Sequence, residues 1–140
     1  MNIHLFKIAK ECSMNSDYSG CGSARIGTVV VYKGTVLAKG WNSNKTHSTQ
    51  AHFNKVRYKN TGNHYLPDKI HSEVMALTKI KYLDIDFSKV EVYIYREFKN
   101  GKMAMCRPCP ACMKMIKEMG IRTIHYTTED GYATEKLAKK

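Results

Sequence analysis

The sequence predicts an α/β fold in which helices cover both faces of a mixed sheet of about five strands, giving three layers. The prediction depends on two observations. Stretches with apolar residues at helical spacing alternate along the chain with short β-branched runs, and this alternation is typical of a sheet flanked by helices. The chain also has 140 residues with 43% hydrophobic content. That is enough for a single compact domain over residues 1–140.

The first part of the chain predicts a helix followed by two strands. Five apolar residues near the N-terminus are spaced as on one face of a helix: Leu5, Phe6, Ile8, Ala9 and Cys12. This helix should end before the Ser-, Asn- and Gly-rich stretch of residues 13–23. The β-branched runs at residues 26–32 and 35–41 then predict two strands, which Lys33 and Gly34 join in a tight turn.

The second part of the chain predicts two helices that alternate with strands. A helix should begin near His71, and its inward-facing residues would be Val74, Leu77 and Ile80. Residues 90–95 alternate like a strand. A further helix should begin at Pro110 and end at Gly120, before a strand at residues 121–127. The buried face of that helix would comprise Met113, Ile116 and Met119.

The last segment has two interpretations. Glu129, Asp130 and Gly131 favour a tight turn, after which residues 132–137 would pair antiparallel with the preceding strand. Residues 133–140 could instead form a short closing helix. We favour the hairpin, and a parallel strand is excluded because it needs a crossover of a dozen or more residues.

Charge and cysteine content restrict the cellular setting and the partners. The N-terminus is interrupted by charge too often for a signal peptide, and no apolar run reaches membrane-spanning length, so we expect a cytoplasmic protein. The odd number of cysteines, five, argues against a disulfide framework, so Cys12, Cys21 and Cys106 should be free thiols. Lys and Arg number 23 against 12 acidic residues, and the net charge of +11 favours anionic partners.

Residues 45–69 contain five of these 23 Lys and Arg residues, with aromatic residues interleaved among them. Such a stretch could follow phosphates and stack on bases. It could equally be a solvated surface loop. Three basic residues are candidate contacts to phosphate or nucleic acid, although each is also explained as ordinary surface: Lys45, Arg57 and Arg96.

The most informative motif combines three metal ligands with one additional carboxylate. His71 and Glu73 form a His-x-Glu pair, and a Pro-Cys-Pro-Ala-Cys run follows that contains Cys109 and Cys112. If Pro110 begins a helix, both thiolates lie on one face of its first turn and can bind one ion. A catalytic zinc takes three protein ligands and keeps its fourth position for water. We therefore expect one catalytic Zn²⁺ and hydrolytic chemistry, with Glu73 as the general base.

The cysteines also allow a redox pair, a structural zinc site or an iron–sulfur site, and each of these is weaker. A Cys-x-x-Cys pair alone could be a redox pair or half of a structural zinc site, but the flanking prolines and the upstream His-x-Glu favour the catalytic site. Cys106, Cys109 and Cys112 together form a run that is typical of iron–sulfur ligands, but no fourth cysteine follows at the required spacing.

These motifs resemble the signature of the zinc-dependent cytidine and deoxycytidylate deaminase superfamily, whose members use zinc-activated water to attack C4 of cytosine or C6 of adenine and expel ammonia. Residues 25–31 resemble its first core strand, and residues 39–43 resemble the end of its second. The resemblance implies a cytidine-deaminase-like fold, in which Asn42 contacts the substrate sugar or base and the backbone N–H of Ser72 meets the ring carbonyl. Two residues depart from the family pattern, because Ser72 replaces the usual Ala and Trp41 the usual Tyr.

Three functions remain in competition. The first is hydrolytic deamination of cytosine to uracil in a cytidine-type nucleotide such as dCMP or CMP. The second, supported by the net charge of +11, is the same reaction in single-stranded DNA or RNA. The third is a noncatalytic, zinc-stabilised module that binds nucleic acid. Adenine as the target base stays open, and the resemblance suggests a homo-oligomer.

Overall fold

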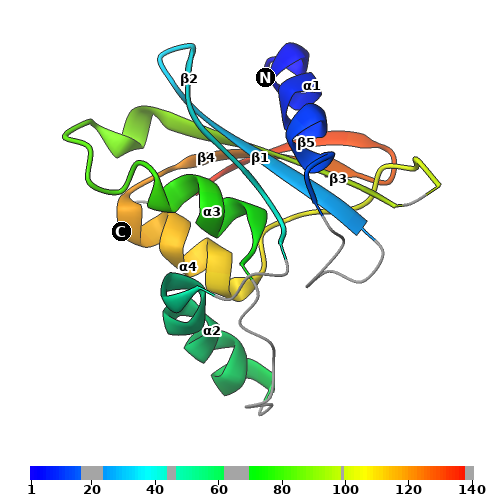
Figure 1. The fold of residues 1–140 in the computed structure, drawn as a ribbon. Coiled ribbons are helices and arrows are strands. Elements are labelled where there is room, and N and C mark those ends of the chain that lie inside the picture. Colours follow the sequence, from blue (N-terminus) through cyan, green and yellow to red (C-terminus); the bar gives the residue numbers. More distant parts are fainter. Residues whose placement is uncertain (17–23, 44–46, 62–69, 99, 138–140) are drawn as a thin grey trace.

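The computed structural model describes residues 1–16, 24–43, 47–61, 70–98 and 100–137, without the side chains of residues 56–61. Its centre is a mixed five-stranded sheet in the order β2-β1-β3-β4-β5. Helix α1 covers one face of the sheet, and α3 and α4 cover the other, with α2 packed outside against α4 (Figure 1). The predicted three-layer α/β fold with a mixed sheet is therefore confirmed.

The strands follow one another along the chain as predicted. Strands β1 (Ala24–Tyr32) and β2 (Thr35–Trp41) form an antiparallel hairpin. The turn between them uses positive φ angles of 49° at Lys33 and 82° at Gly34, a conformation in which glycine is not strained. On its other side, β1 pairs antiparallel with β3 (Val90–Phe98).

The C-terminal hairpin is also confirmed. Strand β4 (Thr123–Thr128) runs parallel to β3, and β5 (Gly131–Lys136) returns antiparallel to β4. Side chains along β5 alternate between exposed and half-buried, as expected of a strand at the sheet edge. The short 3-10 helix η1 (Phe87–Lys89) leads into β3.

Helix α1 (Ile3–Ser13) begins at Asn2, whose side chain accepts a hydrogen bond from the His4 N–H at 3.0 Å. The predicted apolar face is buried against β1 and β3, where it forms one of two hydrophobic clusters. A Cβ atom on Gly27 of β1 would overlap the carbonyl oxygen of Ala9. The glycine therefore permits a helix-to-sheet contact that is too close for any side chain.

The second hydrophobic cluster lies between the opposite face of the sheet and helices α3 (Ser72–Thr78) and α4 (Pro110–Met119). Helix α3 is shorter than predicted, since Ile80 is buried in the turn that follows it. Helix α4 begins at its proline and ends at Gly120, which has the left-handed φ of 89° that suits a glycine cap. Both ends of α4 were predicted from those two residues.

The loop interpretation of residues 45–69 was wrong for the part that forms α2 (Ser48–Thr61). This helix has no continuous apolar stripe, so the periodicity of its residues did not reveal it. Its inward side chains are Phe53 and two buried amides, Gln50 and Asn54, which are joined by a 2.8 Å hydrogen bond. Contacts with the rest of the fold stabilise this helix, which local sequence cannot show.

Two further expectations concern the state of the cysteines and the presence of a membrane-spanning helix. Cys12 and Cys106 are free thiols, as predicted, whereas Cys21 lies outside the described residues. Among the helices in the described part of the chain, none is both long enough and apolar enough to cross a membrane.

Candidate active site

The first half of the site lies at the start of α3. His71 is the N-cap residue of this helix, and Ser72 and Glu73 form its first turn. The backbone N–H of His71 donates a 2.9 Å hydrogen bond to Oε1 of Gln50 in α2. The helix that the sequence did not reveal therefore helps to fix the position of the histidine.

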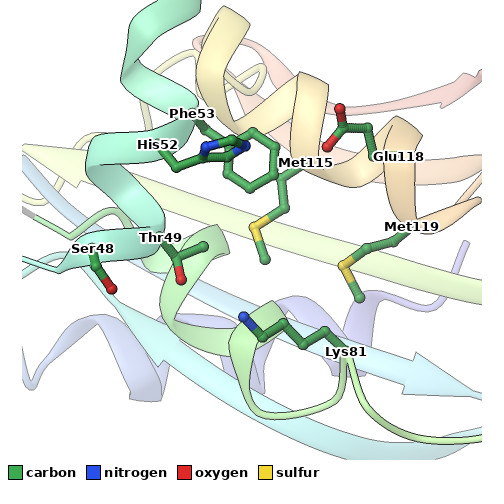
Figure 2. Close-up of a pocket in the computed structure, with 8 residues that line it drawn as sticks. All are labelled: Ser48, Thr49, His52, Phe53, Lys81, Met115, Glu118 and Met119. Carbon is green, nitrogen blue, oxygen red and sulfur yellow. The ribbon is translucent and has the colours of Figure 1, made fainter.

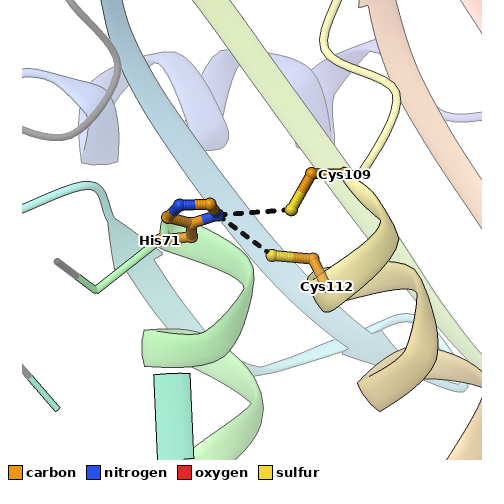
Figure 3. Close-up of side chains that lie close together, drawn as sticks. All are labelled: His71, Cys109 and Cys112. Carbon is orange, nitrogen blue, oxygen red and sulfur yellow. Dashed lines mark hydrogen bonds between the residues drawn. The ribbon is translucent and has the colours of Figure 1, made fainter. Parts of the chain in front are cut away.

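The second half of the site lies at the start of α4. Cys109 is the N-cap residue, and Cys112 lies in the first turn behind Pro110. Nδ1 of His71 is 3.3 Å from Sγ of Cys112 and 3.6 Å from Sγ of Cys109 (Figure 3). The predicted set of three ligands is therefore brought together by two helix N-termini that are distant in sequence.

This donor set fits zinc. All three donor atoms lie within 4.8 Å of one another, so a single ion can contact each of them. One imidazole and two thiolates are typical protein ligands of Zn²⁺, and a set of three leaves one tetrahedral position for water. The cluster within the described residues has these three members and no fourth.

Hydrogen bonding between the thiols makes them differ in acidity when no metal is bound. A hydrogen bond from Cys112, assisted by His71, lowers the pKa of Cys109 to about 4. The same bond, together with full burial, raises the pKa of Cys112 well above its usual value. Cys109 therefore favours the thiolate form that binds metal, whereas Cys112 favours the thiol and must lose its proton to bind.

Cys106 stands apart from this pair. Its Sγ lies 3.2 Å from the carbonyl oxygen of Ile94 and 3.2 Å from Oγ1 of Thr127. Burial raises the pKa of its thiol to about 12. A protonated, hydrogen-bonded thiol is a poor metal ligand, which agrees with the prediction that Cys106 is a free thiol outside the zinc set.

Glu73 lies beside the cluster without belonging to it. Its side chain is 6% exposed, and Oε1 accepts a 2.6 Å hydrogen bond from the hydroxyl of Ser72. Glu73 borders a small cavity of about 110 Å³, together with two of the candidate ligands. The residues that line this cavity are Ile26, His71, Glu73, Ile94, Arg96, Cys106, Arg107 and Cys109. The carboxylate can therefore meet a molecule that reaches the metal.

Two arginines border the same cavity. Arg96 was a candidate from the sequence. It donates a 3.2 Å hydrogen bond from Nη1 to the carbonyl oxygen of Met105, while its Nε is buried without a partner in the described structure. Arg107 was missed, although its position two residues before Cys109 was available as a signal. Its Nε and Nη2 donate to Glu135 at 2.8 and 2.9 Å, and this ion pair lowers the pKa of Glu135.

Asn42 lies directly after β2 and is fully buried. Its Oδ1 accepts a 3.0 Å hydrogen bond from the N–H of Ile26, and its Nδ2 donates to the carbonyl oxygen of Ala24 at 3.1 Å. These bonds hold the end of β2 against the start of β1, where Ile26 lines the small cavity. A contact between Asn42 and substrate stays a prediction, as does the one between the Ser72 N–H and the ring.

The other two candidate phosphate contacts are not placed. Lys45 lies outside the described residues, and Arg57 belongs to the part of α2 whose side chains are not described.

A larger cavity of about 360 Å³ lies between α2, α4 and Lys81 (Figure 2). It is lined by Ser48, Thr49, His52, Phe53, Lys81, Met115, Glu118 and Met119. The α4 residues in this set come from the later turns of the helix, whereas the two cysteines lie at its start. This cavity contains none of the candidate zinc ligands, two of which border the smaller cavity.

The arrangement of a zinc-type ligand set with an adjacent glutamate agrees with comparison to known proteins. Residues 2–128 match the family described as the cytidine and deoxycytidylate deaminase zinc-binding region. The chain belongs to this deaminase family. Zinc is therefore the metal expected at the cluster of His71, Cys109 and Cys112. No significant match was found among curated protein sequences.

Solved structures of deaminases share the fold. The dCMP deaminase from the cyanophage S-TIM5 in apo form is 25% identical with a TM-score of 0.56, covering 91% of this chain and 86% of that chain. The same enzyme in complex with dCMP and dUMP is 24% identical with a TM-score of 0.57, covering 90% and 79%. Cytidine deaminase from Burkholderia pseudomallei is 16% identical with a TM-score of 0.64, covering 97% and 92%. These likenesses agree with the family assignment.

Removal of single ligands should distinguish the zinc set from the nearby thiol. We expect His71→Ala, Cys109→Ser and Cys112→Ser each to lose bound zinc, because two remaining ligands hold the ion weakly. Cys106→Ser should retain about one zinc per chain. Metal content measured by plasma mass spectrometry on purified protein checks this. Loss of zinc from Cys106→Ser, or its retention in Cys112→Ser, would contradict the assignment.

Proposed function

We propose that this deaminase hydrolyses the cytosine ring of a cytidine-type mononucleotide, such as dCMP or CMP, to uracil and ammonia. The observation that carries the proposal is a single cavity bordered by Glu73, His71 and Cys109 together with Arg96 and Arg107. It combines a base, a metal-binding edge and two cations within reach of one small molecule.

The roles of the residues follow from their chemistry. His71, Cys109 and Cys112 would hold Zn²⁺, which lowers the pKa of a bound water into the physiological range. Glu73 would accept a proton from that water, deliver it to the ring nitrogen N3, and transfer a proton to the departing amino group. Water would add to C4, the second proton would pass from the new C4 hydroxyl through Glu73 to the amino group, and the C4–N4 bond would break as the C4=O bond forms, releasing ammonia.

A mononucleotide is favoured over a nucleoside because of Arg96. Arg107 is already paired with Glu135, whereas Nε of Arg96 is a buried donor without a partner in the described structure. Arg96 lines the cavity, and a guanidinium there can form a charge-assisted hydrogen bond with a phosphate oxygen. The likeness to the cyanophage dCMP deaminase supports the same substrate class.

A second candidate is cytosine in single-stranded DNA or RNA, which the net charge of +11 favours. For a single strand, the logarithm of the binding constant falls as the logarithm of the salt concentration rises. The slope is roughly −0.7 for each phosphate that the protein neutralises. A mononucleotide occupies few cations, so its turnover should depend much less on salt. A noncatalytic zinc module is the third candidate, and it requires that Glu73 be dispensable.

The remaining proposals concern the setting. We propose that residues 1–140 act as one deaminase domain in the cytoplasm, where thiol ligands stay reduced. Assembly into a homo-oligomer, suggested by the superfamily resemblance, is part of the same proposal.

The first test is ammonia release by the zinc-loaded protein from cytidine, CMP, dCMP, dCTP and a cytosine-rich single-stranded oligonucleotide. We expect a mononucleotide to react, and Glu73→Ala to lower kcat by about 10²- to 10⁴-fold while retaining zinc, because it removes the general base. Glu118→Ala, in the larger cavity, is the matched control and should react like the parent. Reaction of the oligonucleotide alone would favour the second candidate, and full activity of Glu73→Ala would exclude base catalysis by this residue.

A second test separates phosphate recognition from chemistry. We expect Arg96→Ala to raise the KM for dCMP by about 10- to 100-fold, the range for losing a hydrogen bond to a charged group. The kcat/KM for deoxycytidine should stay within about twofold, because this substrate has no phosphate for the Arg96 side chain to contact. Lys114→Ala, an exposed cation on α4, should change neither parameter. An equal loss of kcat/KM for dCMP and for deoxycytidine would contradict a contact between Arg96 and the phosphate.

A further inference from the structure

A buried chain of hydrogen bonds connects the sheet to Glu73. The Thr28 hydroxyl, on β1, donates to Oγ of Ser72 at 2.8 Å, and the Ser72 hydroxyl donates to Oε1 of Glu73 at 2.6 Å. Thr28 and Ser72 are 0% exposed, and Glu73 is 6% exposed. The three groups therefore form one polar path through an otherwise apolar interface.

The number of available protons decides which group donates and which accepts in these hydrogen bonds. A serine hydroxyl has one proton to donate, and an ionised carboxylate only accepts. Because Ser72 accepts from Thr28, its own proton is directed at Glu73. In a buried site with a low local dielectric, consecutive bonds of this kind strengthen one another.

Thr28 and Ser72 come within hydrogen-bonding distance because α3 packs closely against the sheet. Gly40 of β2 lies opposite Thr28 in the strand register. A Cβ atom on Gly40 would overlap the carbonyl oxygen of Ser72 and crowd the backbone nitrogen of Ala76. The absence of a side chain at Gly40 therefore lets the first turn of α3 lie against β1, within reach of the threonine hydroxyl.

We propose that Ser72 is a positioning residue which, supported by Thr28, holds one carboxylate oxygen of Glu73 so that the other is available for proton transfer. The proposal rests on the role of Glu73 as the general base. Alanine at position 72 would leave the buried Thr28 hydroxyl without its acceptor.

The proposal is tested with Ser72→Ala, Thr28→Val and the double variant, each loaded with zinc. Ser72→Ala should lower kcat about tenfold with KM within about twofold, because the lost bond orients the base and not the substrate. Thr28→Val should lower kcat about threefold, as it acts through Ser72. The double variant should match Ser72→Ala within about twofold, since residues in one network are not additive.

Three controls separate positioning from packing. Thr28→Ser keeps the hydroxyl and should restore kcat relative to Thr28→Val. The double variant removes both hydroxyls and should unfold at a higher temperature than Ser72→Ala while staying as slow, because no unpaired hydroxyl remains. In a Glu73→Ala background, Ser72→Ala should have no further effect on kcat.

A readout independent of turnover is the crystal structure of zinc-loaded Ser72→Ala. We expect the Glu73 carboxylate to occupy more than one rotamer in the variant and a single rotamer in the parent. An unchanged single rotamer, or a wild-type kcat in Ser72→Ala alongside an inactive Glu73→Ala, would overturn the positioning role and leave the proposed function intact. Full activity of Glu73→Ala would instead overturn both.

Discussion

The meeting of two helix N-termini on one face of the sheet is the constraint on which the rest of the site depends. His71 begins α3 and Cys109 begins α4, and their donor atoms lie 3.6 Å apart. Gly40 lets α3 approach the sheet, and Gln50 of α2 holds the backbone of His71. Residues from three separate parts of the chain thus fix one imidazole relative to two thiols, as a metal site requires.

Glu73 and Cys106 lie near the metal cluster but do not belong to it. Glu73 is buried beside the candidate ligands, but its carboxylate is hydrogen bonded to Ser72, and Cys106 is bonded to the neighbouring strands. A three-ligand set with an adjacent base is the arrangement of a hydrolytic metal centre, whereas a fourth protein ligand would make it structural. Arg96 then adds a positive edge to the same cavity.

Sequence predicted those features that depend on local spacing. The Cys-x-x-Cys pair, the helix from Pro110 to Gly120 and the C-terminal hairpin each follow from residues close together in the chain. Helix α2 was missed because Phe53, Gln50 and Asn54 contact other elements and form no apolar stripe. The bond from Thr28 to Ser72 and the ion pair of Arg107 with Glu135 were also not predicted, since these partners lie 44 and 28 residues away in the sequence. Such long-range pairs become visible only in the folded chain.

A crystal structure of the zinc-loaded protein, with the ion located from data collected at the zinc absorption edge, would show directly which side chains hold the metal. We expect Zn–S distances of about 2.3 Å to Cys109 and Cys112 and a Zn–N distance of about 2.0 Å to His71, with a water as fourth ligand. The Glu73 carboxylate should lie beside that water without bonding to zinc. Direct ligation by Glu73 or by Sγ of Cys106 would close the site and contradict a hydrolytic centre.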